Sequence, residues 1–165
     1  MPYSSPKYKL KIREFFSKKV GSSSKILDVG PGMGQYGYLL QDLGYTIDCV
    51  EIFEPYIDKF KLHDKYDNVY GGDIKSFDFS TYDVLILGDI LEHLKIKEAK
   101  KLLKEINEQN KKCLVCVPYE MEQGEVYGNI YEKHHQSDLT PDVMKKRYPE
   151  LKFLIGDDEH GYYIN

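Results

Sequence analysis

The sequence has no long apolar run, no excess of positive charge and few cysteines. None of its apolar runs approaches the ~20 residues that a membrane-spanning helix needs, and its first residues lack the apolar segment of a signal peptide. We therefore expect a cytoplasmic protein without a membrane segment. The formal net charge is -4, whereas binding to nucleic acids needs a basic surface. This composition argues against a nucleic-acid partner.

The few cysteines do not suggest a metal site. Only three cysteines are present, and two of them, Cys113 and Cys116, have a spacing found in metal-binding and redox pairs. They lie in an apolar run that we expect to form a strand, where side chains three positions apart point to opposite faces. We therefore predict no metal site and expect these two cysteines, like Cys49, to be buried.

The length and composition are those of a globular domain. The chain has 165 residues, of which 41% are hydrophobic and 30% charged, so we predict a single domain over residues 1–165 with one full core. An amphipathic pattern predicts an N-terminal helix within residues 1–20. An irregular segment at residues 118–137, rich in polar side chains, interrupts the regular patterns of the chain and is predicted to be an insertion.

Strand and helix patterns alternate along most of the chain. The predicted strands are residues 25–29, 46–51, 68–70, 83–88, 112–117, 151–155 and 162–165, and the predicted helices between and after them are residues 34–43, 55–63, 95–110 and 139–148. Repeated strand–helix–strand units predict an α/β fold with a doubly wound, mostly parallel seven-stranded sheet. We expect helices on both faces of the sheet and an antiparallel edge strand.

Residues 25–34 form the most informative segment of the chain. Apolar residues of a strand carry one acid, Asp28, and lead directly into Gly30, Gly32 and Gly34. Glycine allows the backbone to approach a ligand closely, and the start of the following helix offers unpaired N–H groups and a partial positive charge. This arrangement predicts a site for a nucleotide-sized ligand.

Two kinds of cofactor could use this site. Residues 32–37 match the G-x-G-x-x-G pattern of dinucleotide-binding proteins, which keeps an NAD(P)-dependent oxidoreductase open as an alternative. A carboxylate at Asp28 would repel a pyrophosphate and would suit a positively charged ligand. Further acids follow the next strands, at Glu51, Asp73 and Asp89. Because ligands bind outside the carboxyl ends of the strands in such sheets, we expect all four carboxylates to converge on one cleft.

The pattern Asp28-x-Gly30-x-Gly32-x-Gly34 closely resembles motif I of the class I S-adenosylmethionine-dependent methyltransferases, and the ordered acids extend the resemblance over residues 25–117. It implies a Rossmann-like fold, S-adenosyl-L-methionine as cofactor and S-adenosyl-L-homocysteine as product. It also implies that Glu51 binds the ribose hydroxyls and Asp73 the adenine amino group. The cofactor-binding residues that the resemblance implies are Asp28, Gly30, Pro31, Gly32, Gly34, Tyr36, Glu51, Ile52, Phe53, Gly72, Asp73, Ile74, Asp89 and Ile90.

Three histidines are candidate catalytic bases. His93 lies in a run, residues 88–94, that resembles a segment of small-molecule methyltransferases of this class. It could accept a proton, or it could only pack beside the cofactor. His134 and His135 lie in the 118–137 insertion, which we expect on the side of the acceptor, the molecule that receives the methyl group. The insertion could be a lid over a hydroxylated acceptor or an ordinary surface loop.

The resemblance implies methylation, at oxygen or nitrogen, of a small molecule or of a sugar or glycan. Besides the oxidoreductase, a non-catalytic cofactor-binding scaffold protein stays open, because the chain has no diagnostic catalytic signature. A chain of this size could build its acceptor pocket with a partner subunit, so a homodimer is a further possibility.

Overall fold

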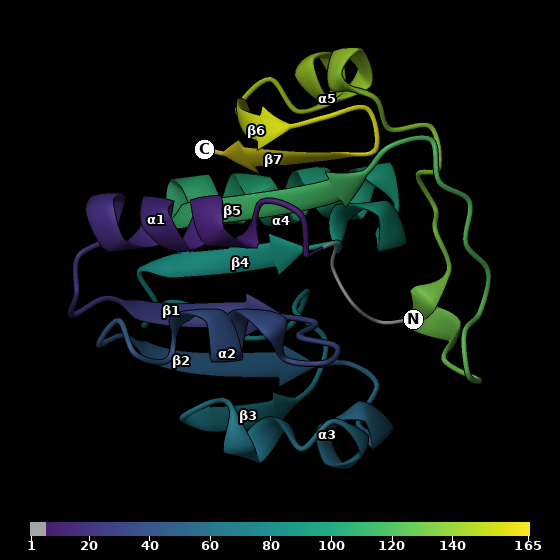
Figure 1. Ribbon diagram of the computed structural model, residues 1–165. Coiled ribbons are helices and arrows are strands. Elements are labelled where there is room, and N and C mark those ends of the chain that lie inside the picture. Colours follow the sequence, from purple (N-terminus) through teal and green to yellow (C-terminus); the bar gives the residue numbers. More distant parts are fainter. Residues whose placement is uncertain (1–5) are drawn as a thin grey trace. The chain divides into compact units, whose positions relative to one another are not determined.

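The computed structural model describes residues 6–165 and contains a seven-stranded sheet with the strand order β3-β2-β1-β4-β5-β7-β6 (Figure 1). The pairs β1–β2, β1–β4 and β2–β3 are parallel, whereas β7 is antiparallel to both β5 and β6. The predicted α/β class with a mostly parallel sheet is confirmed. The strands are β1 (Lys25–Val29), β2 (Thr46–Glu51), β3 (Asn68–Gly71), β4 (Val84–Gly88), β5 (Lys112–Pro118), β6 (Lys152–Gly156) and β7 (His160–Ile164).

Helices occupy most of the connections between the strands. The α-helices are α1 (Lys9–Lys19), α2 (Gln35–Leu40), α3 (Pro55–Lys59), α4 (Ile96–Glu108) and α5 (Pro141–Arg147), and the short 3-10 helices are η1 (Leu62–Asp64), η2 (Leu91–His93) and η3 (Ile130–Glu132). The predicted helix within residues 1–20 is thus α1, and residues 1–5 of that range lie outside the described residues.

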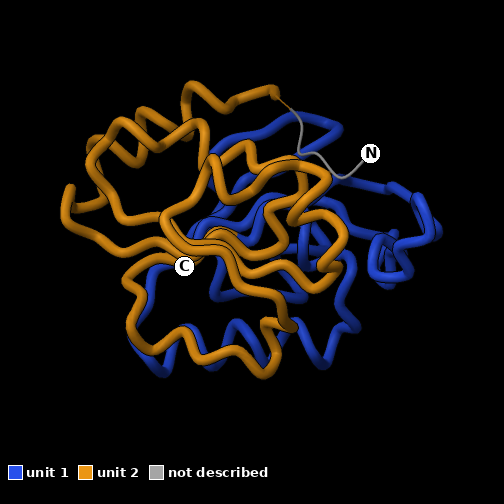
Figure 2. Tube along the Cα trace, turned by 90° about the horizontal axis from the view of Figure 1, so that it is seen from below, with its two compact units in different colours: residues 1, 87–165 blue, residues 2–86 orange. Residues whose placement is uncertain are grey.

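The chain divides into two compact units, one ending at Ile86 and the other running from Leu87 to Asn165 (Figure 2). The division falls inside β4. The sequence predicted a single domain over residues 1–165, and this stays a prediction.

In the first unit, β1 is the central strand. It pairs with β2 on one side and β4 on the other, and Ile26 and Leu27 are completely buried. Helix α1 contributes Ile12 and Phe16 to the core, and the Tyr45 hydroxyl donates a hydrogen bond of 2.8 Å to the Phe16 carbonyl. Four successive residues of β1 are buried, so both faces of this strand are covered, and such strands are mostly apolar, which is the pattern that made β1 recognisable in the sequence.

The helix predicted over residues 55–63 is two shorter elements, α3 and η1. Lys61 lies between them with a left-handed backbone, φ 49°, and such a residue ends a run of right-handed helical turns. The break turns the chain, so that the two residues after η1, Lys65 and Tyr66, return to the glycine-rich turn after β1.

In the second unit, α4 packs on β5. The buried face of α4 consists of Ala99, Leu102, Leu103 and Ile106, and Figure 1 shows the helix running along β5. Cys113 and Cys116 in β5 are buried and form no disulfide bond, and the same holds for Cys49 in the first unit, which confirms their prediction as buried small residues.

The antiparallel strand of the sheet lies one position inside the edge. The predicted antiparallel edge is confirmed: β7 lies between β5 and the edge strand β6 and is antiparallel to both. A tight turn explains this arrangement: Asp157 accepts hydrogen bonds from the amides of Glu159 and His160, at 2.8 and 3.1 Å. The turn directs the chain back beside β5.

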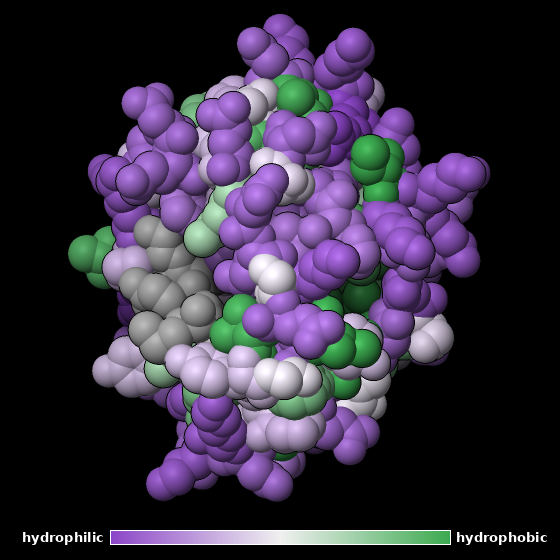
Figure 3. Space-filling view, turned by 90° about the vertical axis from the view of Figure 1, so that its right-hand side faces the viewer, coloured by the Kyte–Doolittle hydropathy of each residue, from purple (hydrophilic) through white to green (hydrophobic). Residues whose placement is uncertain are grey.

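Polar and charged side chains cover most of the surface in Figure 3. In the part of the chain that the structure describes, every helix is too short or too polar to cross a lipid bilayer.

The central strands predict a large difference between two leucine substitutions. Leu85 in β4 is completely buried, whereas Leu10 in α1 is 80% exposed. We expect Leu85→Ala to lower the free energy of unfolding by about 2–5 kcal/mol, because it leaves a cavity, and Leu10→Ala to change it by less than about 0.5 kcal/mol. Urea denaturation measures both, and equal losses would contradict the assigned core.

Candidate functional site

The turn after β1 has the backbone that its three glycines make possible. Gly30, Gly32 and Gly34 all have positive φ, at 59°, 50° and 74°. The Gly30 amide donates to the Val50 carbonyl and the Gly34 amide to the Pro31 carbonyl, both at 2.8 Å. A Cβ at Gly34 would lie 2.6 Å from Lys65 Cδ, so both the conformation and the space at this position require glycine.

Two side chains from residues after η1 hold this turn, and the sequence analysis missed both. The Lys65 ammonium donates to the carbonyls of Met33 and Phe60, each at 2.7 Å. The Tyr66 hydroxyl accepts a 3.2 Å hydrogen bond from the Gly37 amide in α2. These contacts fix the glycine turn and the start of α2 against the rest of the first unit.

Asp28 is buried, whereas the sequence analysis treated its carboxylate as a charge that acts directly on the ligand. Its side chain is 1% exposed and accepts a hydrogen bond from the Tyr66 hydroxyl. Burial raises the pKa of Asp28 to about 7, opposed by the Tyr66 hydrogen bond and by Lys9, and the negative charge of Glu51 raises it further. The Asp28 carboxyl group is therefore enclosed within the first unit, and its burial favours the neutral form.

Glu51 ends β2 in a defined orientation. Its side chain is buried, and Oε1 accepts a 2.8 Å hydrogen bond from the Phe53 amide. The Glu51 carbonyl accepts a 3.0 Å hydrogen bond from the Gly72 amide, which joins the ends of β2 and β3. Ile52 and Phe53 are half-buried directly after the strand. An acid and two apolar side chains are thereby held at one strand end.

Asp73 follows β3 in a tight turn. Its Oδ1 accepts a 2.9 Å hydrogen bond from the Lys75 amide, and Lys75 Nζ lies 3.4 Å from Oδ2. Ile74 is buried beside it, and Gly72 before it has φ 154°. In the same unit the Tyr36 ring is buried under Lys9, whose Nζ lies 3.5 Å from the ring centroid.

The fourth acid, Asp89, belongs to the second unit. It has a left-handed backbone, φ 56°, and its amide donates to the Cys116 carbonyl at 2.9 Å. Its Oδ1 is buried without a hydrogen-bond partner among residues 6–165, and Ile90 beside it is half-buried. Asp28 and Glu51 are close enough for one to raise the pKa of the other. The convergence of all four carboxylates stays a prediction.

Two of the predicted histidines are neighbours. The rings of His93 and His134 have centroids 4.7 Å apart and stand edge to face. Burial lowers the pKa of His93 to about 4, and the charge of His134 lowers it further. His93 is therefore neutral at pH 7 and a weak proton acceptor. The His135 side chain is exposed, and its amide donates a 2.7 Å hydrogen bond to the Glu92 carbonyl.

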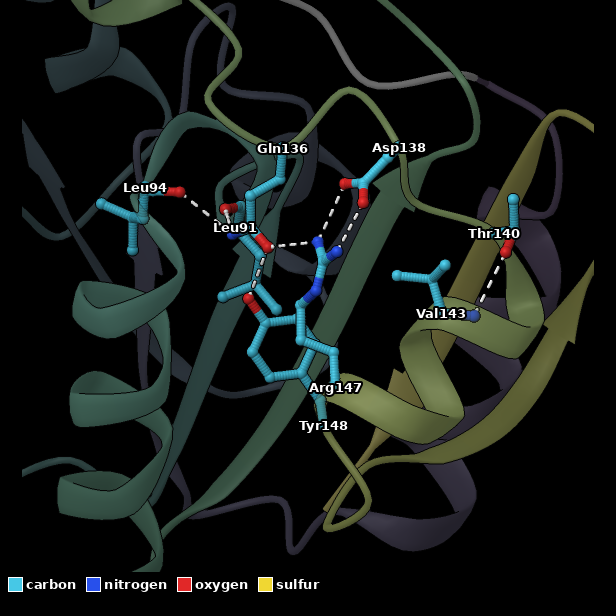
Figure 4. Close-up of polar contacts among 8 residues, drawn as sticks. All are labelled: Leu91, Leu94, Gln136, Asp138, Thr140, Val143, Arg147 and Tyr148. Atoms are coloured by element: carbon cyan, nitrogen blue, oxygen red, sulfur yellow. Dashed lines mark hydrogen bonds and ion pairs between the residues drawn. The ribbon is translucent and has the colours of Figure 1, made fainter.

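Glu92 and Gln136 are two buried polar residues for which the sequence analysis gave no role. Glu92 is 1% exposed and Gln136 is 2% exposed. The pKa of Glu92 is well above its usual value because burial disfavours the charged form and Asp89 lies nearby. Gln136 donates to the carbonyls of Leu91 and Leu94 and accepts from Arg147 and Tyr148 (Figure 4). Only the tertiary structure shows that these side chains are buried.

The buried Asp28 predicts a pH-dependent stability. The folded chain binds this proton more tightly than the unfolded chain, whose carboxyl group has the ordinary pKa of 3.8, so stability falls as the pH rises from about 4 through about 7. About three pKa units correspond to about 4 kcal/mol. Urea titrations should show the free energy of unfolding of the wild type falling relative to Asp28→Asn by up to this amount.

A control for this experiment is Asp42→Asn. Arg13 lowers the pKa of Asp42 through a hydrogen bond, so the stabilisation by the Asp42 carboxylate is lost only at acid pH. The difference in free energy of unfolding between the wild type and Asp42→Asn should therefore stay constant between about pH 5 and 8. A flat difference for Asp28→Asn over the same range would contradict the enclosed carboxyl group.

Comparison with known proteins agrees with this geometry. The sequence profile described as "Methyltransferase domain" matches residues 27–112, which is just over half of the chain. Comparison with curated proteins returns no match. Many solved structures are similar, and three of them illustrate the range.

The methyltransferase domain of a bacterial Hen1 protein (CtHen1) is 19% identical, with 94% of this chain and 95% of that chain covered and a TM-score of 0.68. The glycopeptide N-methyltransferase MtfA, solved with S-adenosyl-L-homocysteine, is 14% identical, with 95% and 88% covered and a TM-score of 0.66. The 1,6-didemethyltoxoflavin-N1-methyltransferase of Burkholderia thailandensis is 12% identical, with 96% and 77% covered and a TM-score of 0.65. At these identities the likeness shows the fold.

The matched range, residues 27–112, contains the end of β1, the glycine turn and the acids Glu51, Asp73 and Asp89. This match decides between the two cofactors that the glycine pattern left open, against the dinucleotide. The chain belongs to the methyltransferase-domain family and is a class I S-adenosylmethionine-dependent methyltransferase.

Proposed function

We propose that this enzyme methylates an oxygen or nitrogen atom of a small molecule or of a sugar or glycan. The observation that carries this choice is the segment after β5, where Tyr127 and Tyr131 are 65% and 46% exposed. Exposed aromatic rings grouped on one loop are suited to packing against the ring of a ligand. The loop is folded: Asn129 accepts a 2.9 Å hydrogen bond from the Tyr131 amide, and Gln123 donates to Glu132.

Two of the similar enzymes support this choice. One is named a glycopeptide N-methyltransferase and the other a 1,6-didemethyltoxoflavin-N1-methyltransferase. The net charge of -4 argues against a nucleic-acid acceptor. Cysteines outside disulfide bonds are typical of proteins in a reducing compartment, which is the basis for proposing a cytoplasmic enzyme. A homodimer that completes the acceptor pocket is part of the same proposal.

The first unit has side chains that fit the cofactor. When bound, S-adenosylmethionine supplies a methyl group activated by its positively charged sulfur. Glu51, fixed by the Phe53 amide, offers an acceptor-only carboxylate, which suits two ribose hydroxyl donors. Ile52 and Phe53 would pack against the adenine and Asp73 would accept from its amino group. The remaining proposed contacts in this unit are Gly30, Pro31, Gly32, Gly34, Tyr36, Gly72 and Ile74, and Asp89 and Ile90 of the second unit are proposed contacts as well.

For Asp28 we propose a positioning role. Its carboxyl group accepts a hydrogen bond from the Tyr66 hydroxyl, and the same hydroxyl accepts a hydrogen bond from the Gly37 amide. Asp28 thereby orients α2 and the glycine turn before it. Its buried position supports this role better than direct contact with the amino group of the cofactor.

A hydroxyl acceptor must also lose a proton. The low pKa of His93 makes it a poor base, and His134 packs against it. The exposed His135 is the histidine that we propose as the base. A general base of this kind typically raises the rate of a reaction by a factor of about 10²–10⁴. For an amine acceptor that arrives unprotonated no base is needed, and positioning alone accounts for the catalysis.

Glu51→Gln should weaken cofactor binding. Loss of a charge-assisted hydrogen bond costs roughly 1.5–3 kcal/mol, so the dissociation constant for S-adenosylhomocysteine should rise about tenfold to a hundredfold. Isothermal titration calorimetry measures this change. Glu108→Gln, at an exposed residue at the end of α4, is the matched control and should bind like the wild type. Equal dissociation constants of Glu51→Gln and Glu108→Gln for S-adenosylhomocysteine would contradict the proposed contact between Glu51 and the cofactor.

The acceptor class can be tested by incubating the enzyme with methyl-labelled S-adenosylmethionine and extracts of metabolites, nucleotide sugars, glycans and RNA. We expect label in a low-molecular-weight or glycan fraction. Label confined to RNA would contradict the proposal. Cofactor binding without transfer to any fraction would favour the non-catalytic alternative.

A further inference from the structure

Glu92, His93 and His134 bring three potential metal ligands together in the second unit. Glu92 and His93 lie in η2, and His134 follows η3 in the segment after β5. One ligand atom from each side chain lies within 4.8 Å of the other two. Donor atoms about 2.1 Å from a tetrahedral metal ion stand roughly 3.4 Å apart, so small side-chain rotations would close this cluster on an ion.

The Glu92 side chain has the surroundings of a metal ligand. It is 1% exposed, and neither carboxylate oxygen has a hydrogen-bond partner among residues 6–165. The neighbouring amides of His135 and Gln136 donate to the Glu92 main-chain carbonyl and not to its side chain. Buried polar atoms without a hydrogen-bond partner are rare in folded proteins, and a metal ion held by the two histidines would coordinate these oxygens.

Both histidines have the hydrogen bonds of metal ligands. His93 Nδ1 lies 3.4 Å from the Lys133 carbonyl oxygen, and His134 Nδ1 lies 2.8 Å from that of Met121. A carbonyl oxygen only accepts, so each Nδ1 must carry the proton, which leaves Nε2 as the nitrogen with a lone pair. A second ring nitrogen that donates to a carbonyl is the usual support of a metal-bound histidine.

The two segments that carry these side chains are bonded directly to each other. The amides of His135 and Gln136 donate to the Glu92 carbonyl at 2.7 and 3.1 Å. The Gln136 side chain donates to Leu91 and Leu94, at 2.7 and 3.0 Å, as Figure 4 shows. Rigid support of this kind holds ligands near a binding geometry before the ion arrives.

We propose that Glu92, His93 and His134 form a binding site for a divalent transition-metal ion such as Zn²⁺ or Mn²⁺. Two imidazoles and one carboxylate suit these ions, whereas Mg²⁺ and Ca²⁺ take oxygen ligands. Asp89, three residues before Glu92, adds a buried carboxylate oxygen without a partner in the described part of the chain. An ion here occupies His93 and His134 as ligands, which leaves His135 as the base.

The site can be tested on the whole chain without any acceptor, so its failure would be distinct from failure of the proposed function. After treatment with a chelator, calorimetric titration with ZnCl₂ and MnCl₂ should show one ion bound per chain. Glu92→Gln, His93→Ala and His134→Ala should each weaken binding by at least about tenfold. His63→Ala, at an exposed histidine in η1, is the control and should bind like the wild type.

Binding by Glu92→Gln that equals the wild type, or no binding by the wild type, would overturn the proposal. A second measurement covers variants that do not fold: crystals of the wild type soaked in MnCl₂ should give an anomalous-scattering peak between the three side chains. A peak at another position, or none, would contradict the site.

Discussion

Burial of the Asp28 carboxyl group inside a strand paired on both sides is the constraint on which the cofactor half of this enzyme depends. A buried acid needs a donor, and the Tyr66 hydroxyl provides it. Tyr66 reaches Asp28 because the helical conformation is interrupted at Lys61. The Tyr66 hydroxyl oxygen also accepts a hydrogen bond from the Gly37 amide. One acid therefore links β1, the segment after η1 and the start of α2, and it fixes the glycine turn between them.

The second unit contains a buried acid in a different situation. Glu92 has no donor to its carboxylate among residues 6–165, although its main-chain carbonyl is fully used by the segment that carries His134 and His135. The first acid is satisfied by the protein, and the second is best satisfied by an ion. Their roles follow from this difference: Asp28 maintains a fold element, whereas Glu92 is available for binding. The expectation of no metal site weighed only the cysteine pair, and the proposed site contains no cysteine.

The sequence predicted those features that depend on local patterns. The bounds of β1 and β2 were predicted correctly because each is a compact run with clear turn residues on either side. The position of Asp28 was wrong because its burial depends on Tyr66, 38 residues away. No role was assigned to Glu92 from the sequence, because its neighbours His134 and Gln136 come from a distant segment without periodicity. Partners of this kind become visible only when the chain is folded.

The most direct test of the account is a crystal structure of the chain with S-adenosylhomocysteine. The account predicts that both ribose hydroxyls bind the Glu51 carboxylate, that the adenine lies against Phe53, and that Asp28 stays bonded to Tyr66 beneath the glycine turn. Electron density for the ligand away from the carboxyl ends of β1 and β2, or a rotated Asp28 that contacts the ligand amino group directly, would contradict it.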